Sequence, residues 1–506
     1  MEVCIRAVRF KSGLIKNVID YNIRRLSNVE LTSLRYPNIK RKTYSKISTS
    51  HLENFGKFLG DEGMITSGSD LESYNTDWMK TCRGQSTLLL RPKSTEEVSK
   101  ILSYCHKENL AVCPQGGNTG LVGGSVPVFD EIILSTVRMK KIWKFDELSG
   151  IMICDAGCVL ETLESFANEI GFTVPLDLGA KGSCHIGGNI ATNAGGLRLI
   201  RYGSLTGNVL GLEVVLADGR ILDCLSTNRK DNTGYNLRQI FIGSEGTLGI
   251  ITKAAILCVV KPSNVAISFL GCSSFNDILK LFKLSKSMLC EVVSSFEMMD
   301  HHALDAVEKH LKLRLPISHH PFYALVEVSG SNEEHNKEKL SAWLECGMEK
   351  NLIKDGTMVT EPGRIQNVWG IRERITEALL HEGYTYKYDI SLPLNNYYEI
   401  VDIMRERLGS SILRCCGYGH IGDGNVHLNM TSTNYSSDIL NQIEPFVYEW
   451  TAKHKGSISA EHGLGFKKRN YIKYSKSQNA INLMKNMKNL LDPKGILNPY
   501  KVLPDE

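Results

Sequence analysis

The sequence contains no CxxC pair among its 14 cysteines, which argues against zinc ribbons and iron–sulfur clusters. It has no run approaching the roughly 18 apolar residues that a membrane-spanning helix requires. It also shows no nicotinamide-binding motif. Cysteines scattered in this way are typical of a reducing compartment, where thiols stay unpaired. Any redox chemistry in this chain therefore needs a different kind of cofactor.

Excess positive charge is absent outside the first 50 residues. The chain of 506 residues has a net charge of +4, although residues 1–50 alone carry eleven Lys and Arg against three acids. The remainder therefore has a net charge of about −4 and gives no electrostatic footprint for nucleic acid. A chain of this length is too long for one core and allows two or three domains.

The basic N-terminal segment has the composition of a mitochondrial transit peptide. Its cations are spread among apolar residues with few acids, as at Arg6, Arg9, Lys11, Lys16, Arg24 and Arg25. The segment lacks a long apolar core, which argues against secretion. A disordered basic tail is the alternative interpretation. We expect residues 1–50 to be the transit peptide and the mitochondrial matrix to be the location.

One loop, residues 114–127 (PQGGNTGLVGGSVP), contains five glycines. Glycine reaches positive φ and lets backbone N–H groups approach an anion such as phosphate. Asn118, Thr119 and Ser125 add side-chain donors and acceptors to the same concavity. The loop has no Gly-Lys-Ser/Thr ending, and it is not a GxGxxG motif that opens a helix. It predicts a different kind of anion-holding loop, with a flexible hairpin as the alternative.

Two further tracts, residues 175–196 and 243–251, are dominated by small residues. Such tracts lack the side-chain volume to fill a core, so we expect their backbone to lie along an extended cofactor. The glycine loop itself follows a strand predicted at 111–113. This strand, the helix after Ser94 and the strands at 87–91 and 132–135 indicate a βαβ unit. A strand at 151–156 and a helix at 159–170 follow.

After about residue 265 the glycines become sparse, and strands such as 322–328 alternate with amphipathic helices such as 333–350. This pattern predicts an α+β cap domain, with an antiparallel sheet covered by helices on one face. A long helix is predicted at 364–380. It places Arg372 and Thr376 one turn apart, so both side chains reach the same ligand, and Lys387 follows on a strand at 384–392.

Arg372 suits a carboxylate ligand because a guanidinium donates two parallel N–H bonds, to which the Thr376 hydroxyl adds a third. The alternative interpretation is an ordinary surface ion pair between Arg372 and the neighbouring Glu373 or Glu377.

Histidines gather in residues 417–430, where His420 ends one strand and His427 lies on the next, across a Gly-Asp-Gly-Asn turn. A hairpin brings the two imidazoles close together, and Asn429 shares the face of His427. A second glycine-bounded turn contains Glu461 and His462. Two histidines and one carboxylate are sufficient for a divalent cation that keeps positions open for substrate. The alternative is that the histidines are ordinary core or surface residues.

The glycine loop and the tracts that follow it resemble the flavin-binding domain of the vanillyl-alcohol oxidase and p-cresol methylhydroxylase superfamily. Across nearly the whole mature chain the motifs resemble the D-2-hydroxyglutarate dehydrogenase family. The resemblance implies an α+β protein in which a two-subdomain FAD-binding domain (51–262) precedes a substrate cap domain (263–435). A C-terminal helical segment (436–506) then returns to the flavin and completes the active site.

The resemblance also assigns ligands. Because no histidine lies in the glycine loop, we expect FAD to be bound non-covalently. The residues expected to bind FAD are Gly116, Gly117, Asn118, Thr119, Gly120, Gly124, Ser125, Gly188, Asn189, Thr192, Asn193, Gly196, Glu245, Gly246, Ile250 and Asn498. The family places a divalent metal, zinc or alternatively manganese, at positions matching His420, His427 and Glu461. It places the substrate carboxylate at positions matching Arg372, Thr376 and Lys387, and we add Asn429 and His462 to the substrate-binding residues.

The implied reaction is oxidation of (R)-2-hydroxyglutarate to 2-oxoglutarate, with the C2 hydride passing to flavin N5. The metal is expected to lower the pKa of the alcohol, and His462 is the candidate base because imidazole titrates near neutral pH. An external acceptor is needed, for which electron-transfer flavoprotein is expected. A homodimer is the oligomeric state we consider. The alternatives are a D-lactate dehydrogenase of the same superfamily and, more remotely, a non-catalytic FAD-bound assembly protein.

Overall fold

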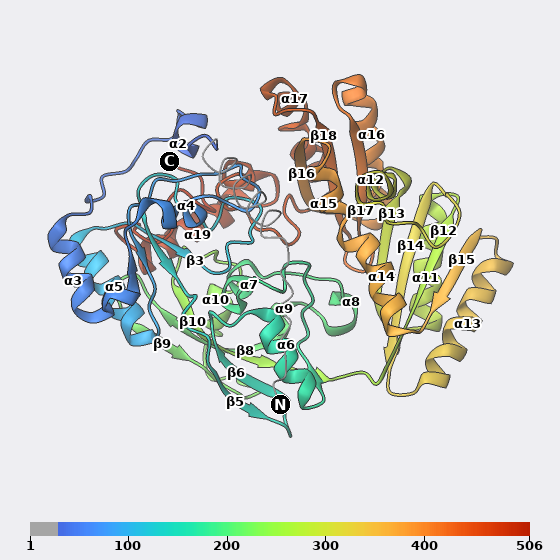
Figure 1. The fold of residues 1–506 in the computed structure, drawn as a ribbon, viewed down its shortest axis with the longest axis horizontal. Coiled ribbons are helices and arrows are strands. Elements are labelled where there is room, and N and C mark those ends of the chain that lie inside the picture. Colours follow the sequence, from blue (N-terminus) through green and yellow to red (C-terminus); the bar gives the residue numbers. More distant parts are fainter. Residues whose placement is uncertain (1–28, 506) are drawn as a thin grey trace, which may run out of the picture.

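The computed structural model describes residues 29–505 and divides them between an N-terminal domain and a cap domain that lie side by side (Figure 1). The N-terminal domain contains two main sheets. The first, in the order β1-β2-β4-β3, consists of β1 (Met64–Ile65), β2 (Leu89–Leu90), β4 (Ile132–Ser135) and β3 (Val112–Gln115). Strands β2, β4 and β3 are parallel, and α5 (Thr95–Glu108) connects β2 to β3. The predicted βαβ unit is therefore confirmed, with the glycine loop directly after β3.

The second sheet is antiparallel, and the other two small-residue tracts lie next to its central strand. Its order is β5 (Ile142–Asp146), β6 (Ile151–Asp155), β10 (Ile250–Leu257), β8 (Val209–Val215) and β9 (Ile221–Cys224). A two-stranded sheet pairs β7 (Phe172–Thr173) with β11 (Val259–Val260). The helices of this domain are α2 (Thr32–Arg35), α3 (Thr49–Leu59), α4 (Gly68–Asn75), α6 (Leu160–Glu169), α7 (Ile186–Thr192), α8 (Leu199–Tyr202), α9 (Leu205–Asn208) and α10 (Arg238–Phe241). Tract 243–251 leads into the central strand β10, and α7 of tract 175–196 contacts that strand.

The cap domain is built on a seven-stranded antiparallel sheet. Its order is β15 (Asp355–Val359), β12 (Asn264–Cys272), β14 (Phe322–Gly330), β13 (Val293–Asp300), β17 (Arg414–His420), β18 (Asn425–Ser432) and β16 (Tyr384–Ser391). The helices around it are α11 (Phe275–Met288), α12 (His301–Leu311), α13 (Glu333–Glu349), α14 (Pro362–Glu373), α15 (Ile375–Leu380) and α16 (Glu399–Leu408).

Helices cover both faces of the cap sheet, so the prediction that they cover only one face is wrong. One core packs α11, α13 and α16 against residues such as Leu270 and Phe296, and a second packs α12, α14 and α15 against residues such as Phe269 and Tyr323. All eight residues of β13 are buried. A strand buried on both faces often reads as a nearly continuous apolar run, as residues 322–326 of β14 do, and this pattern indicates a two-sided cover.

The predicted helix 364–380 is interrupted at Arg374, which has φ −92° and ψ 8° and separates α14 from α15. Arg372 at the end of α14 reaches the sheet, whereas Ile375 and Leu379 of α15 enter the core beside α12.

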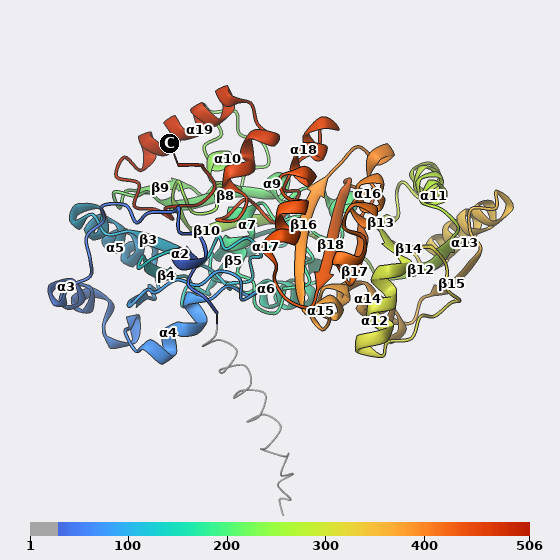
Figure 2. The same cartoon turned by 90° about the horizontal axis from the view of Figure 1, so that it is seen from above.

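The C-terminal segment returns to the N-terminal domain, as Figures 1 and 2 show for α19 (Gln478–Leu491) and the chain end. Its earlier helices α17 (Ser437–Ile443) and α18 (Phe446–Lys453) add Ile443 and Val447 to the core of the cap. Beyond them, Leu497 forms a parallel bridge with Val112 of β3. The segment therefore spans the two domains.

The described part of the predicted transit peptide packs on the N-terminal domain. Residues 1–28 lie outside the described residues. Thr32 and Tyr44 are buried, and the Tyr44 hydroxyl donates to the Gly495 carbonyl at 2.6 Å. The folded body therefore begins before residue 50. Within residues 29–505, no helix is long and apolar enough to cross a bilayer.

Candidate active site

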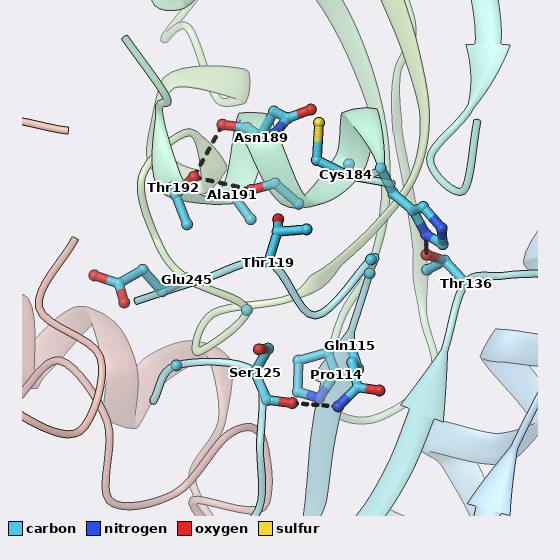
Figure 3. Close-up of a pocket in the computed structure, with 18 of the residues that line it drawn as sticks. Pro114, Gln115, Thr119, Ser125, Thr136, Cys184, Asn189, Ala191, Thr192 and Glu245 are labelled. Atoms are coloured by element: carbon cyan, nitrogen blue, oxygen red, sulfur yellow. Dashed lines mark hydrogen bonds between the residues drawn. The ribbon is translucent and has the colours of Figure 1, made fainter. Parts of the chain in front are cut away.

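The three small-residue tracts line one pocket, in which the glycine loop lies opposite α7 and the turn that carries Glu245 (Figure 3). Thirteen of the expected FAD residues line it: Gly116, Gly117, Asn118, Thr119, Gly120, Gly124, Ser125, Gly188, Asn189, Thr192, Glu245, Gly246 and Ile250. The pocket is lined largely by glycines and other small residues, which let the backbone lie along a cofactor.

The polar side chains of the glycine loop are bonded within the N-terminal domain. Asn118 has φ +52°, and its Nδ2 donates to the Thr76 carbonyl at 2.9 Å. Its Oδ1 accepts from the Ser125 hydroxyl at 2.8 Å. These bonds fix the loop, so that the donors it offers to an anion are chiefly its backbone N–H groups.

Three expected FAD residues, Asn193, Gly196 and Asn498, are not among the residues that line the pocket. Asn193 ends α7 with φ +48°, and its Oδ1 accepts from the Thr206 hydroxyl at 2.7 Å. Gly196 has φ +126° and passes the Asp177 carbonyl so closely that a Cβ would lie 2.6 Å from it. Asn498 contacts the loop, because its Nδ2 donates to the carbonyls of Gly124 and Glu245, while its Oδ1 is buried and has no hydrogen-bond partner among residues 29–505.

Sequence reasoning missed His185 and Thr136, which also line the pocket. His185 precedes α7, and its Nδ1 lies 3.0 Å from the Thr136 hydroxyl. Burial lowers the pKa of His185, so its imidazole is neutral. Its position within the second small-residue tract was the one available signal.

Gly117 is predicted to tolerate no side chain. A Cβ there would lie 1.9 Å from the Ser183 carbonyl oxygen, so Gly117→Ala must displace backbone between the first two tracts. We expect it to destabilise the apoprotein by about 1–3 kcal/mol and to weaken FAD binding. The control is Gly179→Ala, where a Cβ meets nothing within 4 Å. Thermal unfolding and FAD titration test this, and equal behaviour of the two variants would contradict it.

The cap domain and the C-terminal segment bring three imidazoles together around one carboxylate oxygen. The Nε2 atoms of His420, His427 and His462 lie 4.0, 3.6 and 3.7 Å from Glu461 Oε1. The rings of His420 and His427 are 5.4 Å apart, as the hairpin of β17 and β18 predicted. One group of possible metal-ligating atoms, from Asp389, His427, Glu461 and His462, lies within 4.8 Å of one another. This group includes Asp389 and His462 but not the expected ligand His420, and its mixed nitrogen and oxygen donors fit zinc or manganese.

Two buried carboxylates that the sequence reasoning missed hold the other side of these imidazoles. Glu297 of β13 stands directly opposite His420 in the sheet, and its Oε1 lies 2.7 Å from His420 Nδ1. Asp389 of β16 stands opposite His427, and its two oxygens lie 3.7 Å from the Nδ1 atoms of His427 and His462. Such carboxylates fix the orientation of metal-binding imidazoles.

Asp389 has a supporting role in this arrangement. Its Oδ2 accepts the N–H groups of residues 460, 461 and 462, and its Oδ1 accepts from Asn425 Nδ2. With its oxygens engaged in this way, it is a poorer ligand than Glu461. It ties the Glu461-His462 turn to the edge of the cap sheet.

The charges of the cluster are set by burial and by these neighbours. Burial opposes the charge of His420, but the Glu297 carboxylate outweighs it and raises the pKa of His420 to about 9. Burial raises the pKa of Glu461 to about 7. Burial lowers the pKa of His427 well below its usual value and that of His462 to about 4. The imidazole of His462 is therefore neutral, and its pKa is below the near-neutral value that the sequence suggested.

The four expected substrate-binding residues of the cap also converge, around the ring of Tyr418. The Thr376 hydroxyl lies 2.9 Å from that of Tyr418 and 3.3 Å from Lys387 Nζ, and Asn429 stands opposite Lys387 in the sheet. The guanidinium of Arg372 lies 4.8 Å from the centre of the Tyr418 ring. The oxygen Oδ1 of Asn429 is buried and has no hydrogen-bond partner in the described part of the chain.

Arg372 has a different ion-pair partner from the one that the alternative interpretation named. Its Nε and Nη2 lie 3.0 and 2.7 Å from Glu297 Oε2, whereas Glu377 pairs with Arg374. Both Arg372 and Glu297 are buried. One carboxylate, that of Glu297, therefore connects the expected carboxylate anchor to the expected metal ligand His420.

The histidine cluster borders the pocket. His462 is one of the residues that line it, and a Cβ on Gly195, in the second tract, would lie 2.8 Å from Glu461 Oε2. Glu245 closes the contact from the other side, because its carboxylate accepts the N–H groups of Leu464 and Gly465 at 2.7 and 2.8 Å. The two halves of the chain thus share one continuous site.

Two protein families match separate parts of the chain. Residues 86–225 match the FAD binding domain family, and residues 261–502 match the family described as FAD linked oxidases, C-terminal domain. The chain is 59% identical over 465 residues to the mitochondrial D-2-hydroxyglutarate dehydrogenase of Danio rerio, covering 92% of this chain and 87% of that protein. The chain belongs to the D-2-hydroxyglutarate dehydrogenase family. The Bos taurus protein of the same name is 55% identical, covering 95% of this chain and 88% of that protein.

Comparison with solved structures identifies the fold. p-Cresol methylhydroxylase with substrate bound superposes with a TM-score of 0.73 at 14% identity, covering 91% of this chain and 98% of that one. At this identity the likeness shows the fold alone. This likeness confirms the predicted fold class, while the relatives and the family matches above confirm the family and the FAD cofactor. The metal and the individual site residues stay predictions.

Proposed function

We propose that this chain oxidises the α-hydroxyl of (R)-2-hydroxyglutarate to 2-oxoglutarate with FAD and a divalent metal. The observation that carries the proposal is the continuity of the site: His462 lines the FAD pocket and belongs to the His420–His427–Glu461 cluster. The names of the relatives in Danio rerio and Bos taurus support both this substrate and a mitochondrial location. We further propose the matrix as the compartment.

Two groups of residues bind the two ends of the substrate. Arg372, Thr376 and Lys387 bind the distal carboxylate, and Arg372 enters this role already oriented by Glu297. His420, His427 and Glu461 would hold the metal, with the α-hydroxy acid end of the substrate beside it. The unpartnered Oδ1 of Asn429 is placed to accept a hydrogen bond from the substrate.

Oxidation removes a hydride from C2 and a proton from the hydroxyl. When bound, FAD supplies the hydride acceptor, and the metal supplies a Lewis acid that makes the hydroxyl acidic. Nε2 of the neutral His462 takes the proton, while the Asp389 carboxylate, 3.7 Å from Nδ1, stabilises the imidazolium that results. The electrons then leave to an external acceptor, and we propose an electron-transfer flavoprotein for this role. We assign FAD binding as non-covalent.

Removal of the metal tests the metal part of the proposal. We expect a chelator to abolish turnover of (R)-2-hydroxyglutarate while the absorption spectrum of bound FAD persists, because none of the proposed metal ligands His420, His427 and Glu461 is among the residues that line the pocket. Re-addition of zinc or manganese to the stripped protein should restore turnover and identify the ion. Full activity of a protein that elemental analysis shows to be metal-free would contradict the assignment.

The affinity for the dicarboxylate is predicted to depend on pH through Lys387. Burial lowers the pKa of its ammonium to about 8. Since only the charged form attracts the distal carboxylate, KM for (R)-2-hydroxyglutarate should rise as pH increases through about 8, by up to about tenfold per pH unit. Lys387→Met should give a higher KM at low pH and abolish this rise. An unchanged pH profile in that variant would contradict the role of Lys387.

A further inference from the structure

The carbonyl groups of the glycine loop are held by the C-terminal segment. From residue 121 to 124 every carbonyl accepts a bond from this segment, and that of Val126 does so too. The donors are Lys467 Nζ to Leu121 (3.1 Å), Phe466 N to Val122 (2.9 Å), Lys501 Nζ to Gly123 (2.8 Å) and Val126 (2.6 Å), and Asn498 Nδ2 to Gly124 (3.0 Å). The loop therefore presents its acceptors to the chain end.

The bonds to the loop carbonyls also determine the direction of the loop N–H groups. In a planar trans peptide the C=O and the following N–H point in opposite directions. Carbonyls of Gly123 and Gly124 that face Lys501 and Asn498 turn the N–H groups of Gly124 and Ser125 the other way. Gly124 and Ser125 line the cofactor pocket. The C-terminal donors thus help to orient the N–H groups of Gly124 and Ser125 away from the chain end, as an anion in the pocket would require.

Lys501 differs from Lys488, a partly buried lysine near the chain end. Lys488 has a carboxylate partner in Asp492, whereas Nζ of the buried Lys501 has no carboxylate within ion-pair distance among residues 29–505. The charge of Lys501 acts on the carboxyl groups of Glu131 and Glu245 from beyond ion-pair distance, and burial raises the pKa of both groups. A buried ammonium without a close counter-ion is costly, and it lies directly behind a loop that fits an anion.

We propose that Lys501 is a positioning residue for FAD: its ammonium fixes the carbonyls of Gly123 and Val126, and its charge complements the FAD diphosphate. This inference rests on the FAD-dependent function proposed above and extends its cofactor site to the end of the chain. The C-terminal segment then has two tasks, since the same segment supplies Glu461 and His462 to the substrate side.

Reconstitution of full-length apoprotein with FAD, followed by flavin fluorescence, tests the proposal without any turnover. We expect Lys501→Met and Lys501→Gln to raise the Kd for FAD at least about tenfold, which corresponds to about 1.4 kcal/mol. Lys501→Arg, which keeps the charge, should stay within about threefold of the wild type. The Kd for riboflavin, which has no diphosphate, should change less than about twofold in all three variants.

The control variant is Lys488→Met, because Lys488 also donates to backbone carbonyls, those of Thr247 and Leu497, but has its own counter-ion. It should lower the thermal stability of the apoprotein without a selective loss of FAD. An FAD Kd within about twofold of wild type in Lys501→Gln would overturn the proposal, as would equal losses for FAD and riboflavin. Normal FAD binding without oxidation of (R)-2-hydroxyglutarate would instead contradict the proposed function alone.

Discussion

Replacement of Glu461 by Gln is expected to lower kcat for (R)-2-hydroxyglutarate at least about a thousandfold, or about 4 kcal/mol, while FAD stays bound. The Oε1 atom of Glu461 is the point on which three imidazole Nε2 atoms converge, within 3.6 to 4.0 Å. Gln preserves the volume of the side chain but removes the negative charge that a divalent cation requires. Steady-state kinetics and the metal content of the purified variant test this expectation.

Asp423→Asn is the matched control for this experiment. Asp423 lies in the turn between β17 and β18, close enough for its charge to affect Glu461, and its Oδ1 accepts the Asn425 N–H at 3.0 Å. Removing its charge should change kcat by less than about tenfold. If Glu461→Gln retained its metal and most of its activity, the cluster would not be the catalytic metal site.

The second large effect is expected from Arg372. We predict that Arg372→Met lowers kcat/KM for (R)-2-hydroxyglutarate by about a hundredfold or more, because truncation of a buried charge partner costs about 2–5 kcal/mol. D-lactate has no distal carboxylate, so its much lower kcat/KM should change by less than about tenfold. The ratio of kcat/KM for (R)-2-hydroxyglutarate to kcat/KM for D-lactate should therefore fall sharply, and this ratio is the quantity to measure.

Arg374→Met provides a neighbouring control. Arg374 ends the same helix but is partly exposed and pairs with Glu377, so its removal should leave both constants nearly unchanged. A loss in Arg372→Met that is equal for the two acids would mean that Arg372 acts through Glu297 on His420. In that case the carboxylate anchor would have to be sought elsewhere.

The parts of the site that the sequence predicted are those that depend on local geometry. His420 and His427 are seven positions apart on one hairpin, and the turn between them decides that their rings are 5.4 Å apart. Arg372 and Thr376 lie one helical turn apart, and both contact Tyr418 even though the helix is interrupted between them. Local spacing was sufficient for these pairs.

Glu297 and Asp389 were missed because the fold, and not the spacing, chooses their partners. Glu297 lies 123 positions before His420 and meets it only because β13 pairs with β17. Its signal was an acid within an otherwise buried strand, which is costly without a cation or a hydrogen bond beside it. Asp389 had the same signal, two residues after Lys387 on one strand face.

The role of the chain end was predicted only in outline. The resemblance placed Asn498 beside the flavin, which stays a prediction, and the structure adds that its Nδ2 donates to the carbonyls of Gly124 and Glu245. Lys501 gave no signal, because a lysine near a terminus is ordinarily a surface residue. Its burial follows from the pairing of Leu497 with Val112, which a sequence does not display.

Anaerobic mixing of the purified, FAD-loaded protein with (R)-2-hydroxyglutarate tests the central claim most directly, because it observes the flavin without any external acceptor. If the histidine cluster presents the substrate to the cofactor pocket, the visible absorption band of oxidised FAD should disappear, and 2-oxoglutarate should form in an equal amount. The (S)-enantiomer and the Glu461→Gln variant should leave the band intact. A band that persists with the (R)-enantiomer in protein loaded with both FAD and metal would contradict the account.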